Sequence, residues 1–256
     1  MRAVPLALAL SLWAQTVWAD VDRLIDAMGV PELIVAFVTE GLDAGRSIDD
    51  AFLDGQGGDV WADTVQRLYD PARMEAELRT VMAEELDPAV AEQALLFFES
   101  DLGARIINLE VQARQAFLDE TVENAAKAAP TAQAEAVTEY LASRNLIERN
   151  TDVGVAAQAA FLQGLAEASG RLGDPPDMDQ LRARIQGDTE SWLRGYNALV
   201  QSAMTEDEID IYTAFWDTEV GEAVDDALFL AFGQSYTTLS YGLGQAAGRL
   251  LPQNEL

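Results

Sequence analysis

Two ten-residue stretches, FFESDLGARI at residues 97–106 and FWDTEVGEAV at residues 215–224, share one pattern at a constant spacing of 118 residues. Each has two aromatic residues, then a hydroxyl residue, an acid and a glycine. The matched residues are Phe97, Phe98, Ser100, Asp101 and Gly103 in the first stretch and Phe215, Trp216, Thr218, Glu219 and Gly221 in the second. A pattern written twice is either a site used twice or a structural element used twice.

Capping and packing account for every position of the pattern. Ser100 and Thr218 are good helix N-caps, and the acid after each falls in the first helical turn, where negative charge is favoured. The aromatic pair ends the preceding helix, and the glycine allows a close approach of backbone. We therefore interpret both stretches as corners between two helices. The alternative is that the acids and hydroxyls form a polar site.

The rest of the chain also predicts helices. Ala, Leu, Glu, Gln and Arg fill the segments between breakers, and alternating strand patterns are absent. Asp70-Pro71 and Asp87-Pro88 place a capping acid before a proline, and Thr205–Glu208 has the capping-box spacing. Residues 105–122 have the periodicity of one amphipathic helix. We expect an all-α multi-helix bundle of about ten helices.

The repeat extends beyond the two corners and predicts a tandem duplication. Asp70 is matched by Asp188, so a second helix start is expected there, and the apolar Met74 is matched by Trp192 at the same spacing. We expect a first helical unit over residues 20–130, a second over 131–250 and a tail over 251–256. The stretch KAAPTAQ at 127–133 would join the units.

The first 19 residues have the features of a secretory signal peptide. A positive Arg2 precedes an apolar run over residues 5–13, and small Ala19 is the expected cleavage position. The apolar run is shorter than the roughly 20 residues of a spanning helix, although an N-terminal anchor is the alternative. No later segment predicts a membrane span. The expected location is the bacterial periplasm or beyond it.

The charge balance limits the partners. Removal of residues 1–19 leaves 15 basic residues against 44 acidic residues, a net charge near −29. Nucleic acid and anionic membrane surfaces need clustered Lys and Arg, so both are excluded as expected partners. A protein, or a hydrophobic or cationic peptide, is the partner that the composition favours.

The absence of histidine and cysteine excludes several chemistries. Neither Ser-His-Asp nor Cys-His nucleophiles can be assembled, and neither can zinc or copper sites of the usual ligands. No catalytic residue, metal ligand or cofactor is assigned. Carboxylates remain, so a glycosidase-like pair is conceivable. The acidic stretches at 54–59 and 173–179 could hold calcium, but they lack EF-hand spacing and read as turns.

The two corners resemble the motif F-[YFW]-x-[ST]-P-x-G of a family of secreted, all-helical bacterial domains of unknown function. FFESDLG and FWDTEVG match it in the aromatics, the hydroxyl and the glycine, but Asp101 and Glu219 stand where that family has proline. The resemblance covers about 60 residues in each half, as two diverged copies. It implies a helical bundle and a periplasmic address, and it implies no activity.

Three functions are compatible with these observations. The leading hypothesis is a non-catalytic periplasmic protein that binds a protein or envelope component, with a groove between the halves for a helix or a hydrophobic ligand. The first alternative is a carboxylate-dependent hydrolase acting on cell-wall glycan, which needs one acid with a raised pKa in a pocket. The second alternative is a calcium-responsive binding protein.

Overall fold

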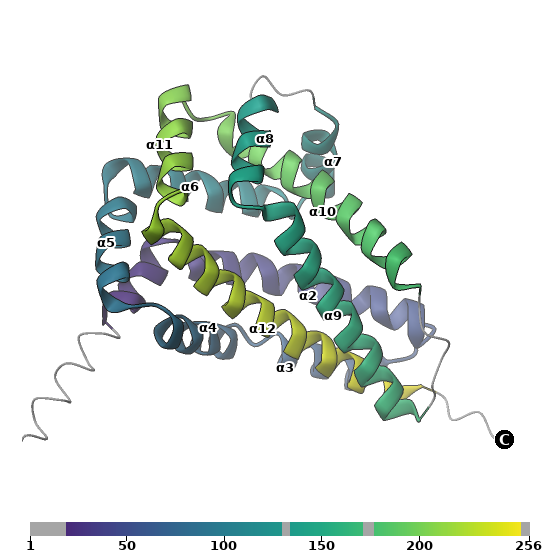
Figure 1. The fold of residues 1–256 in the computed structure, drawn as a ribbon. Helices are drawn as coiled ribbons and strands as arrows, with labels where there is room; N and C mark the ends of the chain where they lie inside the picture. Colours follow the sequence, from purple (N-terminus) through teal and green to yellow (C-terminus); the bar gives the residue numbers. More distant parts are fainter. Residues whose placement is uncertain (1–18, 130–133, 171–176, 252–256) are drawn as a thin grey trace, which may run out of the picture.

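The computed structural model describes residues 19–129, 134–170 and 177–251, and all regular secondary structure in these ranges is helical (Figure 1). The predicted all-α multi-helix bundle is therefore confirmed. A helical stretch at 19–27 precedes the labelled helices. These are α2 (Val30–Phe52), α3 (Gly58–Leu68), α4 (Pro71–Glu85), α5 (Pro88–Phe98), α6 (Asp101–Ala116), α7 (Glu120–Ala128), α8 (Ala134–Ser143), α9 (Leu146–Ser169), α10 (Met178–Gln201), α11 (Glu206–Trp216) and α12 (Glu219–Leu250).

The predicted helix starts are confirmed at the three positions with the strongest capping signals. The side chain of Asp70 accepts a hydrogen bond from the backbone N–H of Arg73 at 2.9 Å, and Asp87 caps α5 in the same manner. Thr205 and Glu208 form a reciprocal capping box at the start of α11. Each cap satisfies backbone N–H groups that have no partner inside the helix.

The prediction of one helix over residues 105–122 is wrong. α6 ends at Ala116, and α7 begins at Glu120 after a new N-cap, in which Asp119 accepts from the backbone N–H of Thr121 at 2.8 Å. Phe117, at the break, is buried at 2% exposure. The apolar periodicity continues through the break, but the local cap at Asp119 competes successfully with helix continuation.

The expected helix start at Asp188 is also wrong, because α10 runs without interruption from Met178 to Gln201. Asp177 caps this helix instead, accepting from the backbone N–H groups of Asp179 and Gln180 at 3.1 Å. The reason is local. Asp70 is followed by a proline, which has no N–H and starts a helix, whereas Asp188 is followed by a threonine that can continue one.

The long helix α12 organises the bundle. It runs diagonally through the molecule alongside α9, and it also contacts α11 and the first-half helices α2 to α5 (Figure 1). One contiguous hydrophobic core contains residues from both halves of the chain, for example Ile34, Leu78, Leu141 and Val224. The helices before and after residue 130 therefore pack on each other.

Glycines bring the backbones of α9 and α12 into direct contact. A β-carbon on Gly164 would overlap the carbonyl oxygen of Tyr241, and one on Gly244 would overlap that of Phe161. A β-carbon on Gly248 would lie 2.6 Å from the carbonyl oxygen of Leu165. Side chains would push the helices apart, so these glycines set the distance between them.

Several sequence predictions fall on residues outside the described ranges. The signal peptide expected at 1–19 lies there except for Ala19, as do residues 130–133 of the joining stretch, residues 173–176 of the second acidic stretch, and residues 252–256 of the tail. For the part of the chain that the structure describes, no helix combines the length and hydropathy needed to cross a membrane.

Substitution of Gly244 by alanine tests the close contact between α9 and α12. The new methyl group meets the backbone of α9, which cannot rotate away, so Gly244→Ala should lower the free energy of unfolding by about 1–3 kcal/mol. The measurement is urea unfolding followed by circular dichroism. Gly187→Ala is the matched control, because Gly187 lies inside α10 with no atom near the new carbon. That change should be neutral or stabilising by up to about 1 kcal/mol, and an equal loss in both variants would contradict the role assigned to Gly244.

Candidate ligand-binding cavity

The first of the two motif stretches forms a tight corner between α5 and α6. The hydroxyl of Ser100 accepts a hydrogen bond from the backbone N–H of Gly103 at 3.0 Å and donates to the carbonyl oxygen of Phe97 at 2.6 Å. A β-carbon on Gly103 would overlap that same carbonyl oxygen. Asp101 is exposed in the first turn of α6.

The second motif stretch forms a corner of the same geometry between α11 and α12. The hydroxyl of Thr218 accepts from the backbone N–H of Gly221 at 3.0 Å and donates to the carbonyl oxygen of Phe215 at 2.6 Å. A β-carbon on Gly221 would again overlap the carbonyl oxygen. Glu219 is exposed in the first turn of α12.

The aromatic residues of the two corners lie against each other. The rings of Phe97 and Phe215 are stacked, with centroids 4.3 Å apart and an interplanar angle of 13°. Phe98 packs edge-on against Phe215 at 5.1 Å and lies 5.9 Å from Trp216. The structure thus brings the motif residues together as packing, and none of the ten lines the cavity described next.

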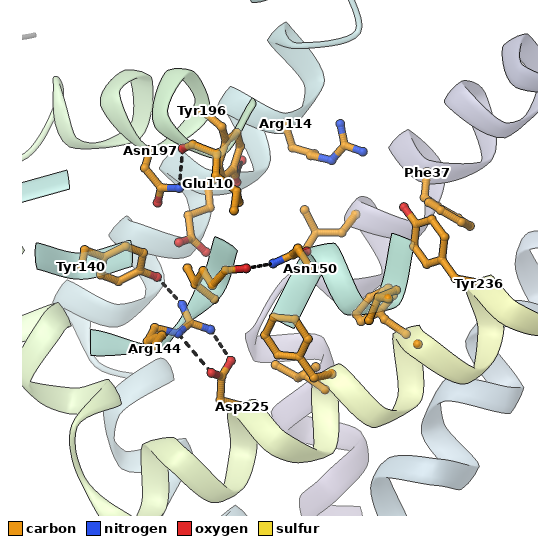
Figure 2. A pocket seen from close by; sticks show the side chains of 18 residues that line it. Phe37, Glu110, Arg114, Tyr140, Arg144, Asn150, Tyr196, Asn197, Asp225 and Tyr236 are labelled. Atoms are coloured by element: carbon orange, nitrogen blue, oxygen red, sulfur yellow. Dashed lines mark hydrogen bonds and ion pairs between the residues drawn. The ribbon is translucent and has the colours of Figure 1, made fainter. Parts of the chain in front are cut away.

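The candidate site is a cavity of about 320 Å³, open to solvent, that is lined by α2, α6, α8, α9, α10 and α12 (Figure 2). Helices of both halves contribute to it. One end is apolar and aromatic, and its walls include Leu33, Phe37, Val153, Phe229, Phe232 and Tyr236. The other end is polar, so the cavity has the mixed lining that is typical of small-molecule sites.

A buried ion-pair network forms the floor of the polar end (Figure 2). Asp225 of α12 is 4% exposed and binds Arg144, which follows α8, through two hydrogen bonds, of which the one from Nε is 3.3 Å long. Arg149 of α9 donates to the same carboxylate at 3.1 Å and to Asp226 at 2.8 Å. Arg144 also donates to the hydroxyl of Tyr140. The buried carboxylate of Asp225 therefore links α12 to α9 and to the residue that follows α8.

Glu110 of α6 faces this network across the cavity. Its Oε1 accepts a hydrogen bond from the hydroxyl of Tyr212 at 2.9 Å, and its backbone carbonyl accepts from Tyr196 at 3.0 Å. Its Oε2 has no hydrogen-bond partner among the described residues. Burial raises the pKa of Glu110, although the hydrogen bond from Tyr212 and the charge of Arg144 act in the opposite direction. A carboxyl of this kind gains from any ligand that supplies a donor or positive charge.

Asn197 of α10 presents a second acceptor beside Glu110 (Figure 2). It is 5% exposed, and its Nδ2 donates to the backbone carbonyl of Leu193 at 2.8 Å. Because only the amide nitrogen can donate to this carbonyl, Nδ2 must point toward Leu193, and Oδ1 must point away from it. Within the described ranges Oδ1 has no hydrogen-bond partner. The polar end therefore has two oxygen acceptors available to a ligand.

A second hollow of about 440 Å³ adjoins the cavity and shares four lining residues with it, namely Asn150, Val153, Leu193 and Tyr236. Its outer wall comes from α7 and α10 and includes Glu123, Lys127 and Asp188. Lys127 forms an ion pair with Glu123, so Asp188 contributes the net negative charge of this lining, which carries one acidic charge in excess.

None of the residues of the polar end was predicted from the sequence. A signal was present in two of them, because Asp225 and Asn197 each lie on the apolar face of a helix, next to buried residues such as Val224 and Val200. A polar side chain on a buried face requires a partner or a function. The sequence could not supply the pairing of Asp225 with Arg144, which is 81 positions away.

The acidic stretch at residues 54–59 lies in the turn between α2 and α3, where Asp54 and Gly55 adopt left-handed backbone conformations. Within residues 19–129, 134–170 and 177–251, no group of three or more His, Cys, Asp or Glu side chains is placed so that it could hold a metal ion.

Comparison with known proteins gives one match. Residues 72–131 match the family described as "Uncharacterized protein conserved in bacteria (DUF2059)". The matched segment contains α4 to α7, with the first corner and Glu110, and it supports a relation to an uncharacterized bacterial family. No curated protein and no solved structure matches the chain.

Replacement of Asp225 by asparagine tests the ion-pair network. The change leaves two partly or fully buried arginines without their shared counter-ion, so the free energy of unfolding should fall by about 3–5 kcal/mol. Asp226→Asn is the matched control, because Asp226 contacts Arg149 but is 75% exposed. Its effect should be about 1 kcal/mol or less. Equal unfolding midpoints for the two variants would contradict the assigned role of Asp225.

Replacement of Glu110 by glutamine tests the raised pKa of its carboxyl. Because the folded-state pKa lies above the unfolded value of about 4.3, the contribution of Glu110 to stability is greatest below that value and is lost as pH rises through the folded-state pKa. The unfolding free energy of wild type minus that of Glu110→Gln should therefore decrease between pH 4 and pH 7. Glu139→Gln, an exposed change, is the control. An increase in the difference with pH would contradict the assignment.

Proposed function

We propose that the protein is a non-catalytic binding protein of the bacterial periplasm and that its cavity takes a small amphipathic molecule, such as a component of the cell envelope. The observation that carries this proposal is the cavity itself. It has an aromatic and aliphatic end and, at the other end, the oxygen acceptors of Glu110 and Asn197, which have no hydrogen-bond partner among the described residues. A ligand that donates hydrogen bonds would pair with them.

The size of the cavity suits a small molecule. Its volume is about 320 Å³, and pockets for small ligands begin at about 300 Å³. This proposal therefore assigns the cavity to a small ligand and not to the peptide helix that the sequence offered as one partner.

The periplasmic location in the proposal rests on the sequence. The leader pattern at residues 1–19 is followed by a chain without cysteine, so no disulfide is needed or available in an oxidising compartment. The match to a family described as conserved in bacteria is compatible with this location.

We further propose that two related units, residues 20–130 and 131–250, form the bundle by tandem duplication. The support comes from the two corners, which have the same cap, the same hydroxyl-to-carbonyl hydrogen bond and the same glycine contact at a spacing of 118 residues. Phe97 stacks on Phe215, so the two corners lie together, as expected for equivalent segments close to a pseudo-twofold axis.

A carboxylate-dependent hydrolase is the second candidate, because Glu110 is an acid with a raised pKa in a cavity. Asp225, the other acid of the cavity, is held by two arginines, which suits a structural role better than that of a base or nucleophile. Release of sugar from peptidoglycan by the wild-type protein, abolished in Glu110→Gln, would favour this candidate over binding alone.

Binding of linear alcohols tests the proposed ligand site. The series from 1-hexanol to 1-decanol should raise the unfolding midpoint, with affinity increasing with chain length until the cavity is full, since each buried methylene contributes about 0.8 kcal/mol. Differential scanning fluorimetry and calorimetric titration measure this. Val153→Phe fills part of the cavity and should weaken binding, whereas Val60→Phe, at a position 65% exposed, should not. If no alcohol stabilises the folded wild type, the proposal is wrong.

A further inference from the structure

We propose that the ligand's polar group is an ammonium, held between the carboxyl of Glu110 and the amide oxygen of Asn197. This inference rests on the proposed ligand site and specifies the chemical class that the site selects. The ligand would then be an amphipathic amine, with its hydrocarbon body against the aromatic end of the cavity and its cationic head at the polar end.

The polar groups available to a ligand are mainly acceptors. Glu110 has one carboxylate oxygen bonded to Tyr212 and the other without a partner in the described chain. Asn197 and Asn150 each use the amide nitrogen in a 2.8 Å bond to a backbone carbonyl, so each turns its oxygen away from that bond. A primary ammonium has three N–H donors and no acceptor, which complements a set of oxygens.

The cationic side chains near the cavity are already neutralised. Asp225 holds Arg144 through Nε and Nη2, and Arg149 is shared between Asp225 and Asp226. Arg114 forms two hydrogen bonds with the carboxylate of Glu40. An anionic head would have to displace one of these partners and would face Glu110. The site therefore discriminates against carboxylates and phosphates by unpaired negative charge.

The overall charge of the chain also favours a cation. The chain carries 44 acidic residues against 16 basic ones, and Asp188 lines the hollow that adjoins the cavity. Such a field concentrates cations near the protein surface.

Ammonium binding would be coupled to the protonation of Glu110. Burial raises the pKa of this carboxyl in the empty site, and a neighbouring cation favours the ionised form. The charged or titratable groups that line the cavity with Glu110 are Arg114 on its own helix, Tyr140 and Arg144 at α8, Tyr196 on α10, and Asp225 and Tyr236 on α12, and Tyr212 on α11 donates a hydrogen bond to Glu110. Affinity for an amine should therefore rise with pH as Glu110 ionises.

Calorimetric titration of three probes of equal chain length provides the test. n-Octylammonium should bind more tightly than 1-octanol, and octanoate should bind most weakly. Glu110→Gln should weaken octylammonium binding about tenfold or more, the range expected for loss of a charge-assisted hydrogen bond. The same change should alter octanol binding by less than about threefold, because the glutamine, whose oxygen accepts from Tyr212, presents an N–H group that can donate to the alcohol oxygen.

The pH dependence and a second variant separate selectivity from folding. Octylammonium affinity should increase between pH 4 and pH 7 in the wild type and stay level in Glu110→Gln, whereas octanol affinity should stay level in both. Asn197→Leu should also reduce the preference for octylammonium over octanol. It preserves Glu110 and so reports on the site if Glu110→Gln fails to fold, as judged by circular dichroism. Exposed Glu139→Gln should change no affinity.

The outcomes distinguish this inference from the proposed function. Equal binding of the three probes, or tighter binding of octanoate, would overturn the ammonium inference and leave the apolar ligand site standing. Failure of all three probes to bind the folded wild-type protein would overturn both. Octylammonium preference that persists unchanged in both Glu110→Gln and Asn197→Leu would show that the preference comes from the overall charge and not from these residues.

Discussion

The close backbone contact between α9 and α12 is the constraint on which the rest of the structure depends. Without side chains at Gly164 and Gly244, the carbonyl oxygens of the opposite helix fill the space that a β-carbon would take. The pair forms a stiff unit against which the first-half helices pack. The same face of α12 then continues past the contact and delivers Asp225, Phe229 and Tyr236 to the cavity. The position of the cavity is therefore a consequence of how closely two helices meet elsewhere.

The ion-pair network converts this scaffold into a site with a fixed polar end. Two arginines and one aspartate are expensive to desolvate, and a well-packed apolar cluster of the same volume would often be at least as stable. The network instead fixes the orientation of the side chains of Arg144, Arg149 and Asp225. Arg144 lies over the ring of Trp216 at 3.8 Å, which anchors the cavity floor to the second corner. The corner geometry and the cavity chemistry are thus connected through one guanidinium group, although no motif residue lines the cavity.

The parts of the structure that were predictable from sequence are the local ones. Helix starts are predictable at Asp70, Asp87 and Thr205, because a cap and the first turn of its helix lie within four residues of each other. The corners were predictable for the same reason. Gly244 and Asp225 were not, because their roles depend on Phe161 and Arg144, which only the complete fold brings near. Even so, an acid on the apolar face of α12 is a signal that sequence reasoning can use, since a buried carboxylate requires a counter-ion or a ligand.

The difference between the two halves explains why the cavity is asymmetric. If the halves are related by 118 residues, the break at Phe117–Asp119 corresponds to residues 235–237, where α12 continues unbroken. In the first half the bend packs the ring of Phe117 against those of Trp192 and Tyr196, with centroids 5.5 and 5.6 Å apart. Tyr196 in turn lines one wall of the cavity. In the second half the straight helix carries Tyr236 along the opposite wall, where it meets Phe37 at 4.6 Å. A perfectly repeated unit would place the same residues on both walls. On that proposed relation the cavity lies where the two halves differ, so its lining can change without disturbing the two corners.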